Sequence, residues 1–177
     1  SGGLVPDTVS GATPLDAMKT QIGLDILPEY IVNQDLFGML GGLGWEWINL
    51  WFLLGGLFLL YRGVINWHVP VAMLLTLFVF SSLTSLFAPD ITGSPMLHLF
   101  SGGTMLGAFF IATDPVSGST TVKGRLVFGA GVGALTYIIR IWGGYPDGVA
   151  FAVLLMNMLV PLIDYYTQPR VYGATSK

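Results

Sequence analysis

Five apolar runs constrain this chain more than any other feature of its sequence. They lie at about Trp45–Tyr61, Val69–Ala88, Met96–Ala112, Leu126–Trp142 and Val149–Ile163. A helix needs about 20 residues, with a range of about 17–25, to cross the hydrocarbon core of a bilayer. The shorter runs must therefore use flanking residues, tilt or break. The pattern predicts an all-α integral membrane protein with about five transmembrane helices.

The composition supports a protein that faces lipid. Of the 177 residues, 53% are hydrophobic and 10% charged, against roughly a quarter charged in an average soluble domain. The chain has no cysteine, which excludes disulfides and thiolate chemistry within it, and no basic cluster that would indicate nucleic acid. Aromatic residues gather at the ends of the runs, where the two membrane interfaces would lie. They are Trp45, Trp47, Trp51, Tyr61, Trp67, Trp142, Tyr145, Tyr165 and Tyr166.

Three parts of the chain differ in polarity. Residues 1–35 are too polar to span a membrane, and five apolar side chains in them fit an amphipathic helix on the membrane surface. These side chains are Leu15, Met18, Ile22, Ile26 and Leu27. Residues 36–167 form the predicted transmembrane domain, and residues 168–177 a tail. The chain starts at Ser1 without a signal peptide, which indicates a fragment or a processed product.

Lysine and arginine predict the orientation. With five spans, Arg62, Lys123, Arg125, Arg170 and Lys177 fall on one side of the membrane. Only two basic residues, Lys19 and Arg140, fall on the other. Because cytoplasmic loops carry the excess of basic residues, the sequence predicts a cytoplasmic C-terminus and a periplasmic segment 1–35.

A short polar stretch, Asp7-Thr8-Val9-Ser10-Gly11-Ala12-Thr13, precedes Pro14. Thr13, with Pro14 next and Asp16 three residues on, is typical of a helix N-cap. The stretch also resembles the Asp-x-x-Ser/Thr-Gly-Ala-Thr pattern on which bacterial flavin transferases attach FMN to threonine through a phosphodiester. The two interpretations are compatible, because a phosphodiester at a helix N-terminus is favoured there as an anion.

A near-copy of this stretch, Asp114-Pro-Val-Ser117-Gly-Ser-Thr120, lies between the third and fourth runs. Its predicted cytoplasmic side separates it from a periplasmic transferase. We expect it to turn the chain, with Asp114 and Ser117 bonding backbone N–H groups.

Two pairs of glycines are expected to allow close helix packing rather than direct contact with a cofactor. Gly103 and Gly107, like Gly129 and Gly133, are four residues apart and would share one face of a span. Pro161 is expected to free the carbonyl of Asn157 and to kink the last helix.

Polar groups near the spans are the candidates for chemistry inside the membrane. They are Glu46, Asn49, His68, His98, Asp114, Arg140, Asp147, Asn157 and Asp164. Glu46 and Asp114 are the preferred carboxylates for an ion path. Two isolated histidines do not make a metal site, and the spacing supports no catalytic constellation.

Three longer stretches resemble the D subunit of the bacterial Rnf electron transport complex, a relative of the B subunit of the sodium-translocating NADH:quinone reductase. They run from His98 to Ser117, from Gly143 to Asn157 and from Pro161 to Gly173. Gly118 and the stretch Gly41–Trp47 depart from the family pattern. The resemblance covers about residues 5–173.

The resemblance implies a fold and a cofactor. The chain would be the C-terminal half of a protein about twice as long, forming one inverted repeat of a urea-transporter-like fold. Thr13 would carry FMN by a phosphodiester, with Asp7, Ser10, Gly11 and Ala12 forming the attachment motif, and riboflavin could bind noncovalently.

The resemblance also implies a function. The chain would belong to a multi-subunit, ion-translocating oxidoreductase of the bacterial inner membrane, working between ferredoxin and NAD and coupled to Na⁺ or H⁺. Its partners would be the other Rnf subunits, the lipid bilayer and a flavin transferase, and the isolated chain would be inactive. Two alternatives stay open: the sodium-translocating quinone reductase subunit, and half of a solute channel or transporter without redox chemistry.

Overall fold

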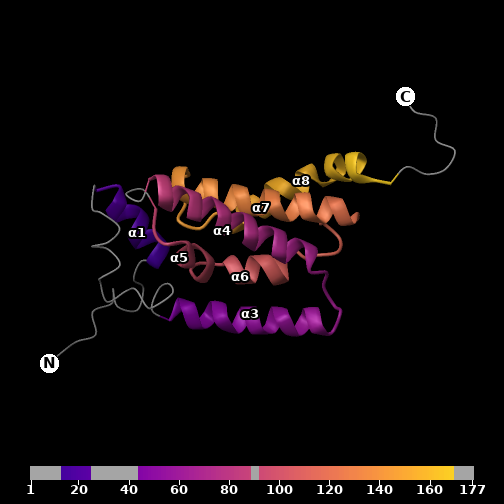
Figure 1. Cartoon of the computed structure of the whole chain (residues 1–177), viewed down its shortest axis with the longest axis horizontal. Coiled ribbons are helices and arrows are strands. Elements are labelled where there is room, and N and C mark those ends of the chain that lie inside the picture. Colours follow the sequence, from indigo (N-terminus) through magenta and orange to yellow (C-terminus); the bar gives the residue numbers. More distant parts are fainter. Residues whose placement is uncertain (1–12, 25–43, 89–91, 170–177) are drawn as a thin grey trace.

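The chain folds into helices joined by short loops (Figure 1). A computed structural model describes residues 13–24, 44–88 and 92–169, and within those ranges it contains no strand. The helices are α1 (Pro14–Ile22), α3 (Trp45–Tyr61), α4 (His68–Phe87), α5 (Pro95–Phe100), α6 (Thr104–Leu106), the π-helix η2 (Gly107–Ile111), α7 (Val122–Trp142) and α8 (Val149–Thr167). Figure 1 shows the long helices lying along a common direction, with α1 at one end.

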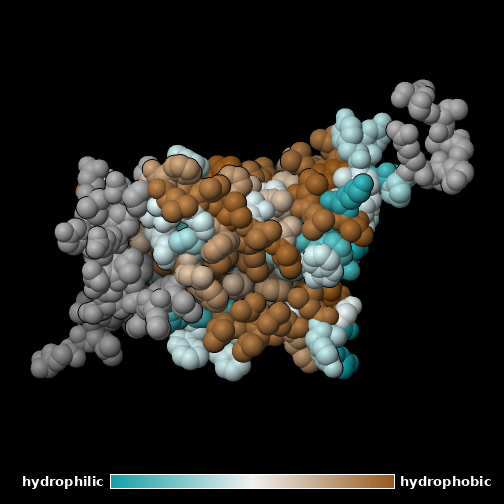
Figure 2. Space-filling model, in the orientation of Figure 1, coloured by the Kyte–Doolittle hydropathy of each residue, from teal (hydrophilic) through white to brown (hydrophobic). Residues whose placement is uncertain are grey.

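Four of the five predicted spans are continuous helices. α3 has the predicted bounds, and α4, α7 and α8 each include most of a predicted run. By length and composition, α4, α7 and α8 can cross a membrane, whereas α3 is a shorter apolar helix of 17 residues. Figure 2 shows hydrophobic side chains covering the middle of one face. So large an exposed apolar surface is typical of a membrane protein, which confirms the predicted class.

The third predicted span is interrupted, which is one of the outcomes expected for the shorter runs, whereas the expectation that Gly103 and Gly107 share one helix face is wrong. α5 ends at Phe100 and α6 begins at Thr104. Gly102 adopts a φ of 63°, a left-handed conformation that glycine takes without a steric penalty. Gly103 therefore lies in the break rather than on a helix face shared with Gly107. Non-helical backbone at membrane depth is tolerated where it is buried in protein.

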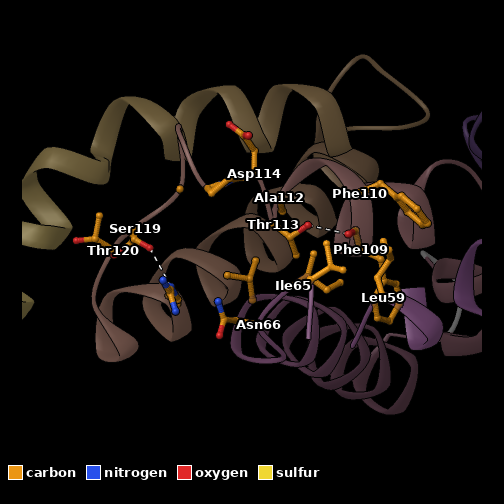
Figure 3. Close-up of a pocket in the computed structure, with 15 residues that line it drawn as sticks. Leu59, Ile65, Asn66, Phe109, Phe110, Ala112, Thr113, Asp114, Ser119 and Thr120 are labelled. Atoms are coloured by element: carbon orange, nitrogen blue, oxygen red, sulfur yellow. Dashed lines mark hydrogen bonds between the residues drawn. The ribbon is translucent and has the colours of Figure 1, made fainter. Parts of the chain in front are cut away.

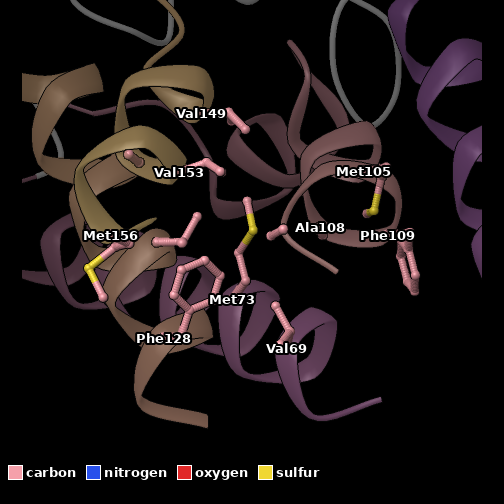
Figure 4. Close-up of a cluster of buried hydrophobic side chains, with 12 residues drawn as sticks. Val69, Met73, Met105, Ala108, Phe109, Phe128, Val149, Val153 and Met156 are labelled. Carbon is pink, nitrogen blue, oxygen red and sulfur yellow. The ribbon is translucent and has the colours of Figure 1, made fainter. Parts of the chain in front are cut away.

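The broken helix packs into a core shared with α4, α7 and α8 (Figure 4). Met73 of α4 and Phe128 of α7 are fully buried, and Ala108 of η2 and Val153 of α8 belong to the same cluster. α8 remains helical through Pro161.

Gly129 and Gly133 bring α7 against α4, as the sequence predicts. A Cβ atom on Gly129 would lie 2.6 Å from the carbonyl oxygen of Val69, and one on Gly133 would lie 2.5 Å from that of Met73. Both distances are shorter than any normal contact, and the obstructing atoms are backbone. The two glycines therefore allow the helix backbones to approach closely.

We predict that Gly133→Ala destabilises the protein by about 1–3 kcal/mol, because the added methyl group forces α4 and α7 apart. The free energy of unfolding in mixed micelles, measured by titration with sodium dodecyl sulfate, checks this. Gly144→Ala is the matched control, since a Cβ atom there would meet nothing within 4 Å. Equal stabilities of the two variants would contradict the packing role of Gly133.

Candidate functional site

Thr13 begins α1 as its N-cap. Its Oγ1 accepts a hydrogen bond from the backbone N–H of Asp16 at 3.3 Å, and Pro14 occupies the first helical position. This confirms the predicted cap. Thr13 is half-buried, and it is the one motif residue that the structure describes, because Asp7, Ser10, Gly11 and Ala12 lie outside the described residues. The hydroxyl oxygen of Thr13 thus sits at the positive end of a helix.

Hydrogen bonds from Lys19 link α1 to the C-terminal end of α7. Its Nζ donates to the carbonyl oxygens of Arg140 at 3.0 Å, Tyr145 at 3.2 Å and Ile139 at 3.4 Å, and also to that of Gly143. The last carbonyls of a helix lack partners within it, and a cation is favourable beside them. Lys19 therefore caps α7 from a helix more than a hundred residues earlier in the chain.

The apolar side of α1 packs on the protein. Leu15 and Met18 are buried, and Met18 and Ile22 contact Leu97 of α5 in a small apolar cluster. A Cβ atom on Gly93 would lie 2.5 Å from the sulfur of Met18. These side chains of α1 are therefore enclosed by protein, whereas Ile26 and Leu27 of the predicted amphipathic helix lie outside the described residues.

Asn49 of α3 supplies hydrogen bonds to the break between α5 and α6. Its Nδ2 donates to the carbonyl oxygens of Phe100 at 3.2 Å and Gly102 at 3.0 Å, and its Oδ1 accepts from the backbone N–H of Met105 at 3.3 Å. Asn49 is fully buried. Asn49 therefore supplies hydrogen-bond partners to backbone groups that the interrupted helix leaves unpaired. Such partners are needed because unpaired backbone groups are unfavourable when buried.

Arg140 of α7 also donates hydrogen bonds to residues on either side of the break between α5 and α6. Its Nη1 donates to the carbonyl oxygen of His98 at 2.6 Å, and its Nη2 donates to Thr104 Oγ1 at 2.8 Å. Nη2 also forms a salt bridge of 3.0 Å with Asp147 Oδ1. The other carboxylate oxygen of Asp147 accepts from the Gly103 N–H at 2.6 Å. One ion pair thus ties together α7, the α7–α8 loop and the broken helix.

Asp147 stays ionised in this arrangement. Burial alone would raise the pKa of its carboxyl group, but the charge of Arg140 and the hydrogen bonds from Gly103, Arg140 and Val149 outweigh burial and hold the pKa below its usual range. Sequence reasoning noted Arg140 and Asp147 only as polar groups at predicted span ends and missed their pairing. The signals available were an arginine inside an apolar run and an aspartate in a glycine-rich loop.

A cavity of about 350 Å³ (Figure 3) lies at the end of the molecule opposite α1, where the loops after α3 and η2 are found in Figure 1. It is lined by Leu59 and Ile65 on one side and by Asp114, Thr120 and other residues of the η2–α7 loop on the other. The loop after α3 and the loop after η2 therefore share this end, whereas α1 and the loop after α7 share the other.

Asp114 organises its own turn. Its Oδ2 accepts from the backbone N–H of Ser117 at 3.0 Å and from the Ser117 hydroxyl at 2.8 Å. These bonds keep the pKa of the Asp114 carboxyl below its usual range. The prediction was right that Asp114 bonds a backbone N–H. It was wrong for Ser117, whose hydroxyl donates to Asp114 instead, because the carboxylate is the stronger acceptor within reach.

Thr120, the threonine of the near-copy, is hydrogen-bonded to α8. Thr120 Oγ1 donates to Asp164 Oδ2 at 2.9 Å, and Ser119 Oγ donates to Asp164 Oδ1. Thr121 then caps α7, its Oγ1 accepting from the Gly124 N–H at 2.9 Å. The stretch from Asp114 to Thr120 is thus a turn between η2 and α7 that is hydrogen-bonded to α8. The described side-chain contact of Thr13, by contrast, is the N-cap hydrogen bond of its own helix.

The structure does not bring the two candidate ion-path carboxylates together. Glu46 is half-buried in the first turn of α3, one helical turn before Asn49, which contacts the break. Asp114 lines the cavity beside Leu59, near the other end of α3.

Comparisons with known proteins identify the family. A model of the NQR2, RnfD, RnfE family matches residues 3–173. The D subunit of the ion-translocating oxidoreductase complex of Aliivibrio salmonicida (strain LFI1238) is 60% identical over 167 residues, which are 94% of this chain and 48% of that protein. The corresponding D subunit from Pectobacterium atrosepticum is 60% identical over 168 residues, with the same two coverages. The chain spans about half the length of the curated relatives it matches, and it belongs to the NQR2, RnfD, RnfE family.

Proposed function

We propose that this chain is the flavin-bearing part of a membrane subunit in an Rnf-type, ion-translocating oxidoreductase. The observation that carries the proposal is the motif ending in Thr13, on a chain 60% identical to the D subunits of ion-translocating oxidoreductase complexes. The helical structure with three apolar helices long enough to cross a membrane supports a membrane subunit. The other subunits of such a complex would be its partners.

Thr13 would hold FMN through a phosphodiester on its Oγ1. The N-terminal N–H groups of α1 and the helix dipole would favour the phosphate charge there. Lys19 and the buried face of α1 fix this helix against α7 and α5, so a group on Thr13 would keep a defined position relative to the membrane domain. Bound in this way, FMN would supply one- and two-electron redox chemistry.

The distribution of basic residues favours a periplasmic position for Thr13. Arg125 lines the cavity shared by the loops after α3 and η2, and Arg62 directly follows α3. Lys19 and Arg140, at the other end, donate to backbone and side-chain acceptors within the protein. The positive-inside rule then puts the Arg62 and Arg125 end in the cytoplasm. This assignment supports our proposal of an inner-membrane protein with a periplasmic flavin segment.

Ion movement would be coupled to the charge of the reduced flavin. A reduced, anionic flavin attracts a nearby cation, and more strongly where the dielectric constant is low. Because Glu46 and not Asp114 lies at the α1 end of the molecule, Glu46 is the better placed of the two predicted carboxylates for such coupling. Na⁺ and H⁺ would both satisfy this electrostatic argument.

The test is covalent flavin on the chain itself. The protein is produced with and without a bacterial flavin transferase, denatured, and examined for in-gel flavin fluorescence and for an FMN-sized mass on the peptide that contains Thr13. We expect both signals only with the transferase. If both are absent in its presence, the flavin proposal fails and the non-redox channel alternative becomes the better one.

A further inference from the structure

A cavity of about 240 Å³ lies beneath α1. Leu15, Met18 and Ile22 of α1 line one side, and His98 and Arg140 line the other. The cavity is separate from the one beside Asp114 at the far end of the molecule. Its walls combine an apolar side with a polar side, which is typical of sites that bind small molecules.

The polar side of the cavity carries buried hydrogen-bonding atoms without partners among the described residues. They are both ring nitrogens of His98, Nε of Arg140 and Oγ1 of Thr92, which lies beside the hydroxyl of Tyr137, another buried group of the described helices without a hydrogen bond of normal geometry. His98, Arg140 and Thr92 are each 4% exposed, and each lines this one cavity. Buried polar groups normally find a partner, because leaving them unpaired is unfavourable. Three such residues around a single space indicate that something else occupies it.

The charges around the cavity favour an anion. The terminal nitrogens of Arg140 donate hydrogen bonds to the His98 carbonyl oxygen, Thr104 and Asp147. The carboxylate of Asp147 balances the guanidinium charge. Lys19 also lines the cavity, and its ammonium group donates to uncharged carbonyl oxygens. The local charge is therefore positive. Nε–H of Arg140, the hydroxyl of Thr92 and one N–H of His98 can all donate.

We propose that the cavity beneath α1 is a binding site for an oxyanion, a phosphate or carboxylate group that accepts hydrogen bonds from Arg140, Thr92 and His98. The volume suits a small anion or the head of a larger molecule, being equivalent to about eight waters of ~30 Å³ each. The apolar side chains of α1 would cover the carbon atoms next to the charged group. The oxyanion can come from a free solute or from the head group of an anionic phospholipid.

The test measures anion binding to the protein purified in mild detergent with the subunits that accompany it. Equilibrium dialysis against radiolabelled inorganic phosphate and, separately, radiolabelled acetate gives the number of sites and their affinity. Thr92→Val keeps the shape of the side chain and removes one donor to a charged acceptor, which should weaken this site roughly tenfold. His98→Leu should abolish it.

Thr113→Val is the matched control. The hydroxyl of Thr113 donates to the Phe109 carbonyl oxygen at 2.7 Å, beside the other cavity, so anion binding should stay at the wild-type value. Size-exclusion elution and the thermal midpoint establish that each variant is folded. Because Thr92→Val is isosteric, the test does not depend on His98→Leu folding.

The two sources of the oxyanion give different results. A free solute predicts one phosphate or acetate site that Thr92→Val weakens and His98→Leu abolishes. A lipid predicts that mass spectrometry finds one more anionic phospholipid per wild-type protein than per His98→Leu or Thr92→Val protein, and that added phosphate does not bind. If neither anion binding nor phospholipid content changes in the variants, the cavity holds water alone and the proposal is wrong.

Discussion

Replacing Thr13 with alanine is expected to abolish covalent flavin attachment completely. Alanine has no oxygen to form the phosphodiester, so in-gel fluorescence and the added mass should both disappear. The same change removes the hydrogen bond from Asp16 N–H to Thr13 Oγ1, which should weaken α1 by about 1 kcal/mol. Loss of flavin alone would therefore not distinguish a missing acceptor from a frayed helix.

Two further substitutions separate these causes. Thr13→Asn should keep the cap, because asparagine is among the best N-cap residues, and yet lose the flavin. Thr13→Ser should keep both the cap and a hydroxyl that can be esterified. Flavin lost in both Thr13→Asn and Thr13→Ala but kept in Thr13→Ser would identify the hydroxyl as the acceptor.

Thr120→Ala tests the specificity of the site. Thr120 belongs to the near-copy of the motif, but its hydroxyl donates to Asp164 and lies at the other end of the molecule. Covalent flavin should be unchanged in this variant. If flavin were lost from Thr120→Ala and retained in Thr13→Ala, the assignment of the modified threonine would be reversed.

The helices could be predicted from the sequence because their signal is local. Long apolar runs identify segments that lipid or apolar protein must surround, and α3 follows the predicted run from Trp45 to Tyr61. Hydropathy carries no information on backbone conformation. The length of the run from Met96 to Ala112 therefore allowed a break but did not give its position at Gly102. A polar Asn49 within an apolar helix was a sign that some backbone group elsewhere needed a partner.

The candidate site was predictable only where its contacts are local. Thr13 caps α1 by accepting a hydrogen bond from the backbone N–H of Asp16, three residues on, and the order of threonine, proline and aspartate encodes that cap. Lys19 reaches the end of α7, and Arg140 reaches the carbonyl oxygen of His98 on α5. These contacts depend on how helices far apart in the sequence pack together, which residue spacing does not specify.

Arg140→Met is expected to be the most destabilising substitution in the described part of the chain. The Arg140 side chain is 1% exposed, and methionine would leave Asp147, the His98 carbonyl oxygen and Thr104 without their shared donor. Removing one member of a buried ion pair costs about 3–5 kcal/mol. Because the Asp147 side chain is 33% exposed and keeps the Gly103 N–H, we expect about 3 kcal/mol, at the lower end of that range.

Unfolding of the Arg140→Met protein in mixed micelles measures this cost, and a second substitution identifies its origin. Asp147→Asn removes the negative charge that Arg140→Met leaves unpaired, while its amide oxygen can still accept from the Gly103 N–H. If the unpaired carboxylate is the main source of instability, the double variant should be less destabilised than the sum of the two single variants. Additive effects would instead mean that Arg140 acts chiefly through the His98 carbonyl oxygen and Thr104.

Arg62→Met is the control, because Arg62 is an exposed arginine directly after α3. This substitution should leave the free energy of unfolding within about 0.5 kcal/mol of the wild-type value. A comparable loss in Arg62→Met would show that the membrane domain responds to a missing positive charge in general, and not to the ion pair that closes the broken helix.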